Sequence, residues 1–144
     1  MKKNVRTLVS LLLVIVAIIA VAAPALALSP SMAYKSSSGT YADATGEYDY
    51  SCKTGASLTN ANATMSYEKS VSLMCNLDVE VEYLNAYYHK DVDDAVTGRS
   101  LSISCNNTVK VYVNGVLTTC YGSISSVTGT YRFGGFFSKQ HTLS

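Results

Sequence analysis

The chain has 144 residues, of which 48% are hydrophobic, with four cysteines, eleven tyrosines and no tryptophan. Three of its eleven basic residues lie within the first six positions, so residues 28–144 carry eight basic and ten acidic side chains and a formal charge of −2. Because those eight basic residues are scattered along the sequence, the composition excludes binding to nucleic acid through a basic patch.

The first 27 residues have the organisation of a secretory signal peptide. A basic start, Met1–Arg6, precedes the aliphatic run Leu8–Ala23, and Ala25-Leu26-Ala27 provides small residues two positions apart. We therefore predict a signal-peptide helix, cleavage after residue 27 and a secreted, extracellular protein. The alternative is an uncleaved anchor formed by Leu8–Leu28. No second run of about 20 apolar residues follows, so we expect no membrane span after cleavage.

The remaining 117 residues divide into a short N-terminal segment and one domain of ordinary size. Small, polar and turn-forming residues dominate residues 28–45, which predicts a flexible linker or a weak first strand. Residues 46–144 are predicted to form a single β-rich domain.

The clearest strand in the domain is Val71–Tyr83. Apolar residues occupy all of its odd positions, and polar residues occupy all but one of its even positions, Met74. This period of two places one face of the strand in a core and the other in water. A second clear signal is Asn114-Gly115, the preferred pair for a two-residue type I′ hairpin, which predicts that Val113 pairs with Val116.

Shorter alternating segments complete the predicted fold. They are Glu47–Cys52, Leu58–Tyr67, Ser100–Cys105 and Ser123–Phe137, whereas Asn85–Val96 is interpreted mainly as a loop. No segment after residue 27 has a sustained helical period. Six to eight short strands without crossover helices predict an all-β fold, an antiparallel β-sandwich or a partly open barrel.

The four cysteines are even in number and lie on the apolar side of their strands. In an exported protein, this pattern predicts buried disulfides among Cys52, Cys75, Cys105 and Cys120. Three pairings are possible, and we favour Cys52 with Cys75 and Cys105 with Cys120, because each bond would then tie neighbouring strands. The spacings do not suit a metal site, and we predict neither a metal nor a cofactor.

Two acidic clusters are candidate sites. Asp78, Glu80 and Glu82 share one strand face at separations of roughly 7 Å, which could suit acid–base chemistry but is typical of a solvated face. Asp91, Asp93 and Asp94 fall in the predicted loop, where oxygen-rich loops can bind calcium. Their spacing does not match the twelve-residue calcium loop, and we favour solvated side chains in both clusters.

The sequence offers little for catalysis. A small extracellular hydrolase would have to use His89 with Asp91 or Asp93, but neither a nucleophile-elbow motif nor a glycine-rich phosphate loop occurs. We therefore predict that the protein is not an enzyme.

Aromatic residues provide the candidate contact surface. Tyr87 and Tyr88 stand beside the acidic segment, and Phe136 and Phe137 are adjacent, so both phenylalanines cannot face inward in a regular strand. Tyrosine suits contacts with proteins or carbohydrates. The predicted partner is an unknown protein or a cell-envelope glycan.

Together these features predict a secreted, non-catalytic β-domain that acts through surface contacts. The alternative is a secreted antagonistic peptide. In its size, signal peptide and short strands rich in Ser, Thr, Tyr and Gly, the chain resembles lactococcin-972-like bacteriocins. That resemblance implies a β-sandwich that inhibits other bacteria; no motif carries over residue by residue, and the four cysteines are a departure.

Overall fold

The computed structural model describes residues 28–144, so the predicted signal peptide lies outside the described residues. The described part is all-β and antiparallel, and it contains no helix of the length and hydropathy needed to cross a membrane. Its strands are β1 (Ala33–Asp43), β2 (Gly46–Ala56), β3 (Asn60–Tyr83), β4 (Ala86–Asn106), β5 (Thr108–Val113), β6 (Val116–Tyr121), β7 (Ser123–Phe133) and β8 (Phe137–Leu143).

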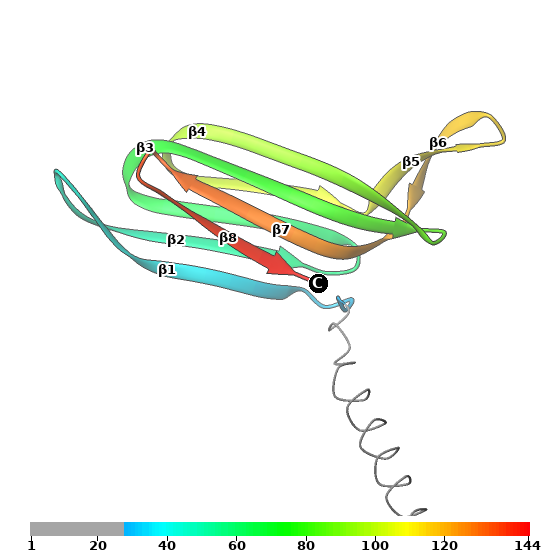
Figure 1. Ribbon diagram of the computed structural model, residues 1–144, viewed down its shortest axis with the longest axis horizontal. Coiled ribbons are helices and arrows are strands. Elements are labelled where there is room, and N and C mark those ends of the chain that lie inside the picture. Colours follow the sequence, from blue (N-terminus) through cyan, green and yellow to red (C-terminus); the bar gives the residue numbers. More distant parts are fainter. Residues whose placement is uncertain (1–27) are drawn as a thin grey trace, which may run out of the picture.

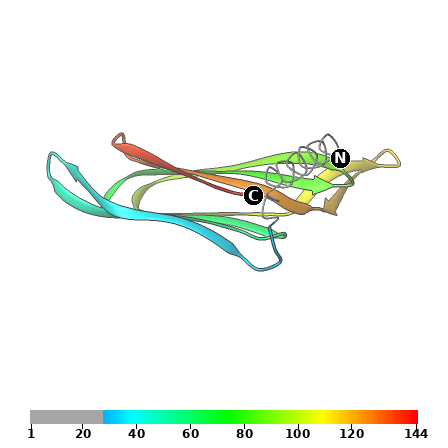
Figure 2. The same cartoon turned by 60° about the horizontal axis from the view of Figure 1, so that its bottom comes forward.

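A long, bent hairpin of β3 and β4 organises the molecule. Residues 60–66 of β3 pair with residues 100–106 of β4, and residues 71–83 pair with 86–98, with an irregularity between Ser66 and Val71. Before this bend β3 also pairs with β2, and after it β3 pairs with β7. The sheet therefore folds over on itself into a nearly closed, barrel-like shape (Figure 1, Figure 2).

The ends of the folded sheet are β1 and β8. These two strands stand at the two ends of the order β1-β2-β3-β7-β8, yet the fold brings parts of them into contact. Side chains rather than a backbone ladder bridge the gap: Tyr41 of β1 stacks on Phe137 of β8 with ring centroids 4.6 Å apart.

The core confirms the alternation read from the sequence. Leu73, Cys75, Leu77, Val79 and Val81, all on the predicted inner face of β3, are buried. An aromatic cluster closes the end where β7 turns into β8 and comprises Tyr41, Tyr48, Tyr50, Tyr67, Phe133 and Phe137.

Two predictions about the strands were wrong. Not all strands are short, because β3 has 24 residues and β4 has 21. Asn85–Val96 is not a loop, because nearly all of it belongs to β4. Polar residues stand on both faces of this edge segment, and its half-buried side carries Lys90 between Tyr88 and Val92, which interrupts the apolar pattern. The turn before it uses Leu84 and Asn85 at positive φ, a pair with no strong turn signature.

The Asn114-Gly115 hairpin has the predicted register. Val113 pairs with Val116, Val111 with Thr118 and Val109 with Cys120, and both turn residues have positive φ. The hairpin is, however, a separate two-stranded sheet that projects from the body (Figure 1).

Candidate interaction surface

Exposed apolar side chains gather at one end of the molecule. Of eleven large hydrophobic residues exposed in residues 28–144, seven lie on the β5–β6 hairpin, in the β3–β4 turn or at the start of β4. Leu84 is 81% exposed, and Tyr112 and Tyr121 are each 75% exposed. We call this surface the apolar tip and define it as Leu84, Tyr87, Tyr112, Val113, Val116, Leu117 and Tyr121.

The base of the hairpin is fixed, whereas its end extends into solvent. The Asn107 side-chain amide donates to the carbonyl of Gly122 over 2.6 Å, and the Gly122 N–H donates back to the Asn107 carbonyl over 3.0 Å. Lys90 Nζ of β4 donates to Thr108 Oγ1 of β5 over 3.3 Å and to the Asn106 carbonyl over 2.8 Å, and Val109 is buried. These contacts hold β5 against the start of β4 and direct the turn at Asn114 outward.

Both faces of the hairpin carry apolar side chains. Val113 and Val116 form a cross-strand pair on one face, and Tyr112 and Leu117 form one on the other. Lys110 is the single charged residue in β5 and β6. A hairpin that is apolar on both faces leaves its hydrophobic surface in water, and exposed apolar patches of this kind mark interaction sites.

The structure separates the four residues predicted as a contact surface. Tyr87 belongs to the apolar tip, and Tyr88 beside it is half-buried. Phe136 and Phe137 lie at the β7–β8 turn, at the other end of the molecule (Figure 1). Phe136 is exposed, whereas Phe137 is half-buried and stacks on Phe133 with ring centroids 4.7 Å apart. Sequence reasoning missed the hairpin part of the tip, because alternation does not show whether an apolar face finds a partner.

All four cysteines are free thiols, so the predicted disulfides are not found. The favoured pairing assumed that each pair would stand on adjacent strands at the same level. Instead Cys52 lies opposite Met65, and Cys105 lies opposite Ala61 in the main sheet, whereas Cys120 lies in the separate hairpin. Burial raises the pKa of the Cys75 thiol to about 12, which keeps it protonated and unreactive at neutral pH.

A buried polar chain joins the two edges of the sheet. Ser37 Oγ of β1 is 2.8 Å from His141 Nε2 of β8, and His141 Nδ1 is 3.4 Å from Thr54 Oγ1. Thr54 Oγ1 is in turn 2.6 Å from the hydroxyl of Tyr131. Gly129 leaves room for the threonine, because a β-carbon there would collide with Thr54 Oγ1. His141 is only 3% exposed. We call this hydrogen-bonded row of Ser37, His141, Thr54 and Tyr131 the clasp, because it connects β1 with β8.

The clasp has two groups used in nucleophilic catalysis, a serine and an imidazole, but a threonine occupies the place of the orienting carboxylate. Burial, with Lys35 and Lys139 nearby, lowers the pKa of His141 and favours the neutral imidazole. His89, the histidine that a hydrolase was predicted to use, is exposed on the outer face of β4. Its nitrogens approach Asp78 Oδ1 at 3.5 Å and Glu80 Oε2 at 3.6 Å, rather than Asp91 or Asp93.

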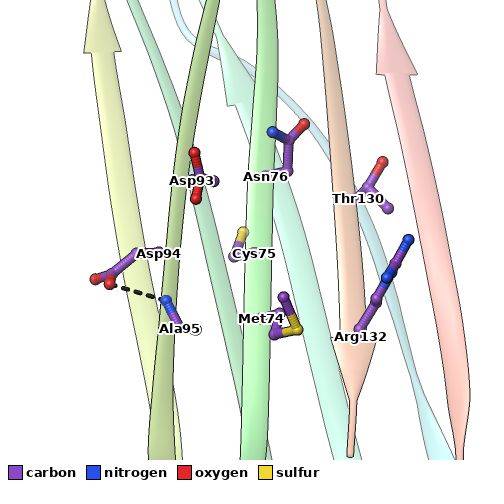
Figure 3. A pocket seen from close by; sticks show the side chains of 8 residues that line it. All are labelled: Met74, Cys75, Asn76, Asp93, Asp94, Ala95, Thr130 and Arg132. Atoms are coloured by element: carbon purple, nitrogen blue, oxygen red, sulfur yellow. Dashed lines mark hydrogen bonds between the residues drawn. The ribbon is translucent and has the colours of Figure 1, made fainter. Parts of the chain in front are cut away.

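The acidic segment lies on β4 and not in a loop, which removes the loop geometry considered for calcium. In residues 28–144 no group of three or more His, Cys, Asp or Glu side chains is arranged to hold a metal ion. Asp93 and Asp94 instead border an open hollow of about 390 Å³ on the outer face. Its other edge is formed by Thr130 and Arg132 of β7 (Figure 3).

The comparisons with known proteins give no relative: no family model, curated protein or solved structure matches the chain. The function is therefore argued from the surface itself.

Proposed function

We propose that the protein is a secreted, non-catalytic binding domain that docks onto a protein partner through the apolar tip. The observation that carries this proposal is the concentration of seven of the eleven exposed large hydrophobics at one end, on the β5–β6 hairpin and around the β3–β4 turn. Scattered apolar residues would need no explanation, but a cluster costs solubility unless a partner covers it.

The chemistry of the tip favours a protein over the other partners considered. Val116 and Leu117 offer aliphatic surface with few hydrogen-bonding groups, which suits the apolar core of a protein interface better than a glycan. The hairpin also has open backbone edges, and unpaired N–H and C=O groups are excluded from bilayer hydrocarbon. Tyr112, Tyr121 and Tyr87 add the aromatic side chains that are enriched at interfaces.

A retention assay tests the proposal. The purified full chain is incubated with intact cells of several bacterial species, and bound protein is measured by immunoblot before and after protease treatment of the cells. We expect the variant Val116→Lys/Leu117→Lys to lose retention by about tenfold, since it places charge where a partner would desolvate it. Met74→Lys is the matched control, because Met74 is exposed on β3 away from the tip.

Three outcomes decide between the alternatives. Retention that depends on both the tip and protease-sensitive cell proteins supports the proposal. Equal retention of the tip variant and the control variant, or absence of retention on every cell type, contradicts it. If the protein inhibits bacterial growth and the tip variant does not, the protein is an antagonistic peptide that acts by binding through the tip.

A further inference from the structure

The β6 strand differs from the other strands in its charge. Of the eight strands in residues 28–144, it is the only one without a charged side chain. The other edge strands carry charges, such as Lys35 in β1, Asp91 in β4 and Lys139 in β8, and Lys110 stands in the middle of β5. Charged residues, lysine above all, protect edge strands from pairing with other chains. The open edge of β6 lacks this protection.

We propose that β6 pairs antiparallel with β6 of a second copy of this chain, so that two hairpins form one four-stranded sheet. The inference rests on the proposed function, because β6 belongs to the apolar tip and a second copy of the chain would cover its open edge. A two-stranded sheet is marginally stable alone, and added strands stabilise it.

The hairpin geometry determines the register of this pairing. In a two-residue type I′ hairpin, Val113 and Val116 form a hydrogen-bonded pair, and bonded and non-bonded pairs then alternate along the strands. The backbone groups of Leu117, Thr119 and Tyr121 consequently point away from β5. A two-fold axis at Thr119 aligns these three residues with their counterparts, Leu117 opposite the second copy's Tyr121, and satisfies the open edge.

The side chains and charges agree with this register. On one face, Tyr112, Leu117 and the second copy's Tyr121 form a continuous apolar row across the strands. Lys110 lies opposite Thr119, so the two Lys110 residues are three strand spacings apart, roughly 14 Å. This distance exceeds the Debye length of about 8 Å at physiological salt, so their repulsion is screened.

The pairing enlarges the proposed binding surface. Edge-to-edge association covers backbone groups but leaves both faces of the sheet open. On the face that carries Tyr112, the two hairpins then form one flat apolar platform, to which each copy contributes Tyr112 and Leu117. A single chain presents only half of this platform to a partner.

Light scattering of the full chain across a concentration series, up to about 1 mM to populate weak complexes, tests the pairing. We expect the mass to rise to that of two chains. Thr119→Pro removes an N–H that points away from β5, so the hairpin persists while the dimer is weakened by at least about tenfold. Thr119→Val keeps the N–H and the dimer. A single-chain mass at every concentration, or equal effects of both variants, overturns the inference.

A cross-linking variant tests the register independently of stability. Thr118 would face the second copy's Cys120 in a non-hydrogen-bonded pair, with a Cα separation of about 4.5 Å that suits a disulfide. Under diamide, Thr118→Cys should give a covalent dimer and Thr118→Cys/Cys120→Ser should not. Equal cross-linking of both variants contradicts the register. Tip-dependent cell retention by a monomeric chain would reject this inference alone, whereas tip-independent retention would reject the proposed function.

Discussion

At the scale of single residues, the clasp makes stability depend on the protonation of His141. Burial lowers the pKa of this imidazole below its usual 6.5, so in the folded state it stays neutral over a pH range where the unfolded chain already binds a proton. The unfolded state therefore binds more protons there, and stability falls as the pH drops below about 6.5.

Urea unfolding at pH 7.5 and pH 5.5 checks this prediction. We expect a lower free energy of unfolding at the acidic pH, and a smaller difference in His141→Gln. His89→Gln is the control, because His89 is exposed on the outer face. A pH dependence that persists unchanged in His141→Gln would contradict the role of the clasp.

Two buried tyrosines allow a matched test of the hydroxyl chain. The Tyr131 hydroxyl is 2.6 Å from Thr54 Oγ1, whereas the buried Tyr67 hydroxyl has no hydrogen-bond partner among the described residues. We expect Tyr131→Phe to cost about 1–2 kcal/mol and Tyr67→Phe to cost nothing or to stabilise. Chemical denaturation measures both changes, and equal effects would show that the Thr54 contact contributes nothing.

The free thiols differ in accessibility. Cys120 is half-buried, whereas Cys52, Cys75 and Cys105 are buried, and burial raises the pKa of both Cys52 and Cys75. With a thiol-specific reagent at pH 8, we expect one fast-reacting group that disappears in Cys120→Ser, and three that react only on unfolding. Fewer than four thiols in denaturant would indicate that disulfides have formed.

At the scale of elements, the β5–β6 hairpin depends on a close approach at its base. A β-carbon on Gly122 would collide with the carbonyl oxygen of Glu82, whereas Gly135 has open space around it. Gly122→Ala should therefore destabilise the protein by about 1–3 kcal/mol, and Gly135→Ala should be near neutral. Thermal unfolding measures the melting temperature of both variants. A Gly122→Ala variant as stable as the unmodified protein would contradict the close approach of Gly122 to Glu82.

The sequence predicted some elements well because their residues carry the signal locally. Leu73 to Val81 alternates with polar neighbours, and Asn114-Gly115 encodes the turn type and thus the register of β5 with β6. The first half of β4 was missed because polar residues stand on both of its faces, with Lys90 on the half-buried side. Of the tip, Tyr87 was predicted, but Val116 and Leu117 resemble core residues in sequence.

At the scale of the whole molecule, the path of the sheet decides which apolar residues remain outside. The bend between Ser66 and Val71 folds the β3–β4 hairpin over the core, and the clasp and the aromatic cluster bring β1 and β8 together. The hairpin of β5 and β6 leaves this closed body. Such long-range arrangements could not be predicted from local alternation, which is why the predicted disulfide pairing was wrong and the apolar tip was not foreseen.

The central claim is that the tip serves binding and contributes little to folding. It is tested most directly by measuring unfolding and cell retention on the same variant, Val116→Lys/Leu117→Lys. Both residues are exposed, so we expect the free energy of unfolding to change by less than about 0.5 kcal/mol while retention falls about tenfold. A loss of several kcal/mol in stability with retention intact would contradict the account.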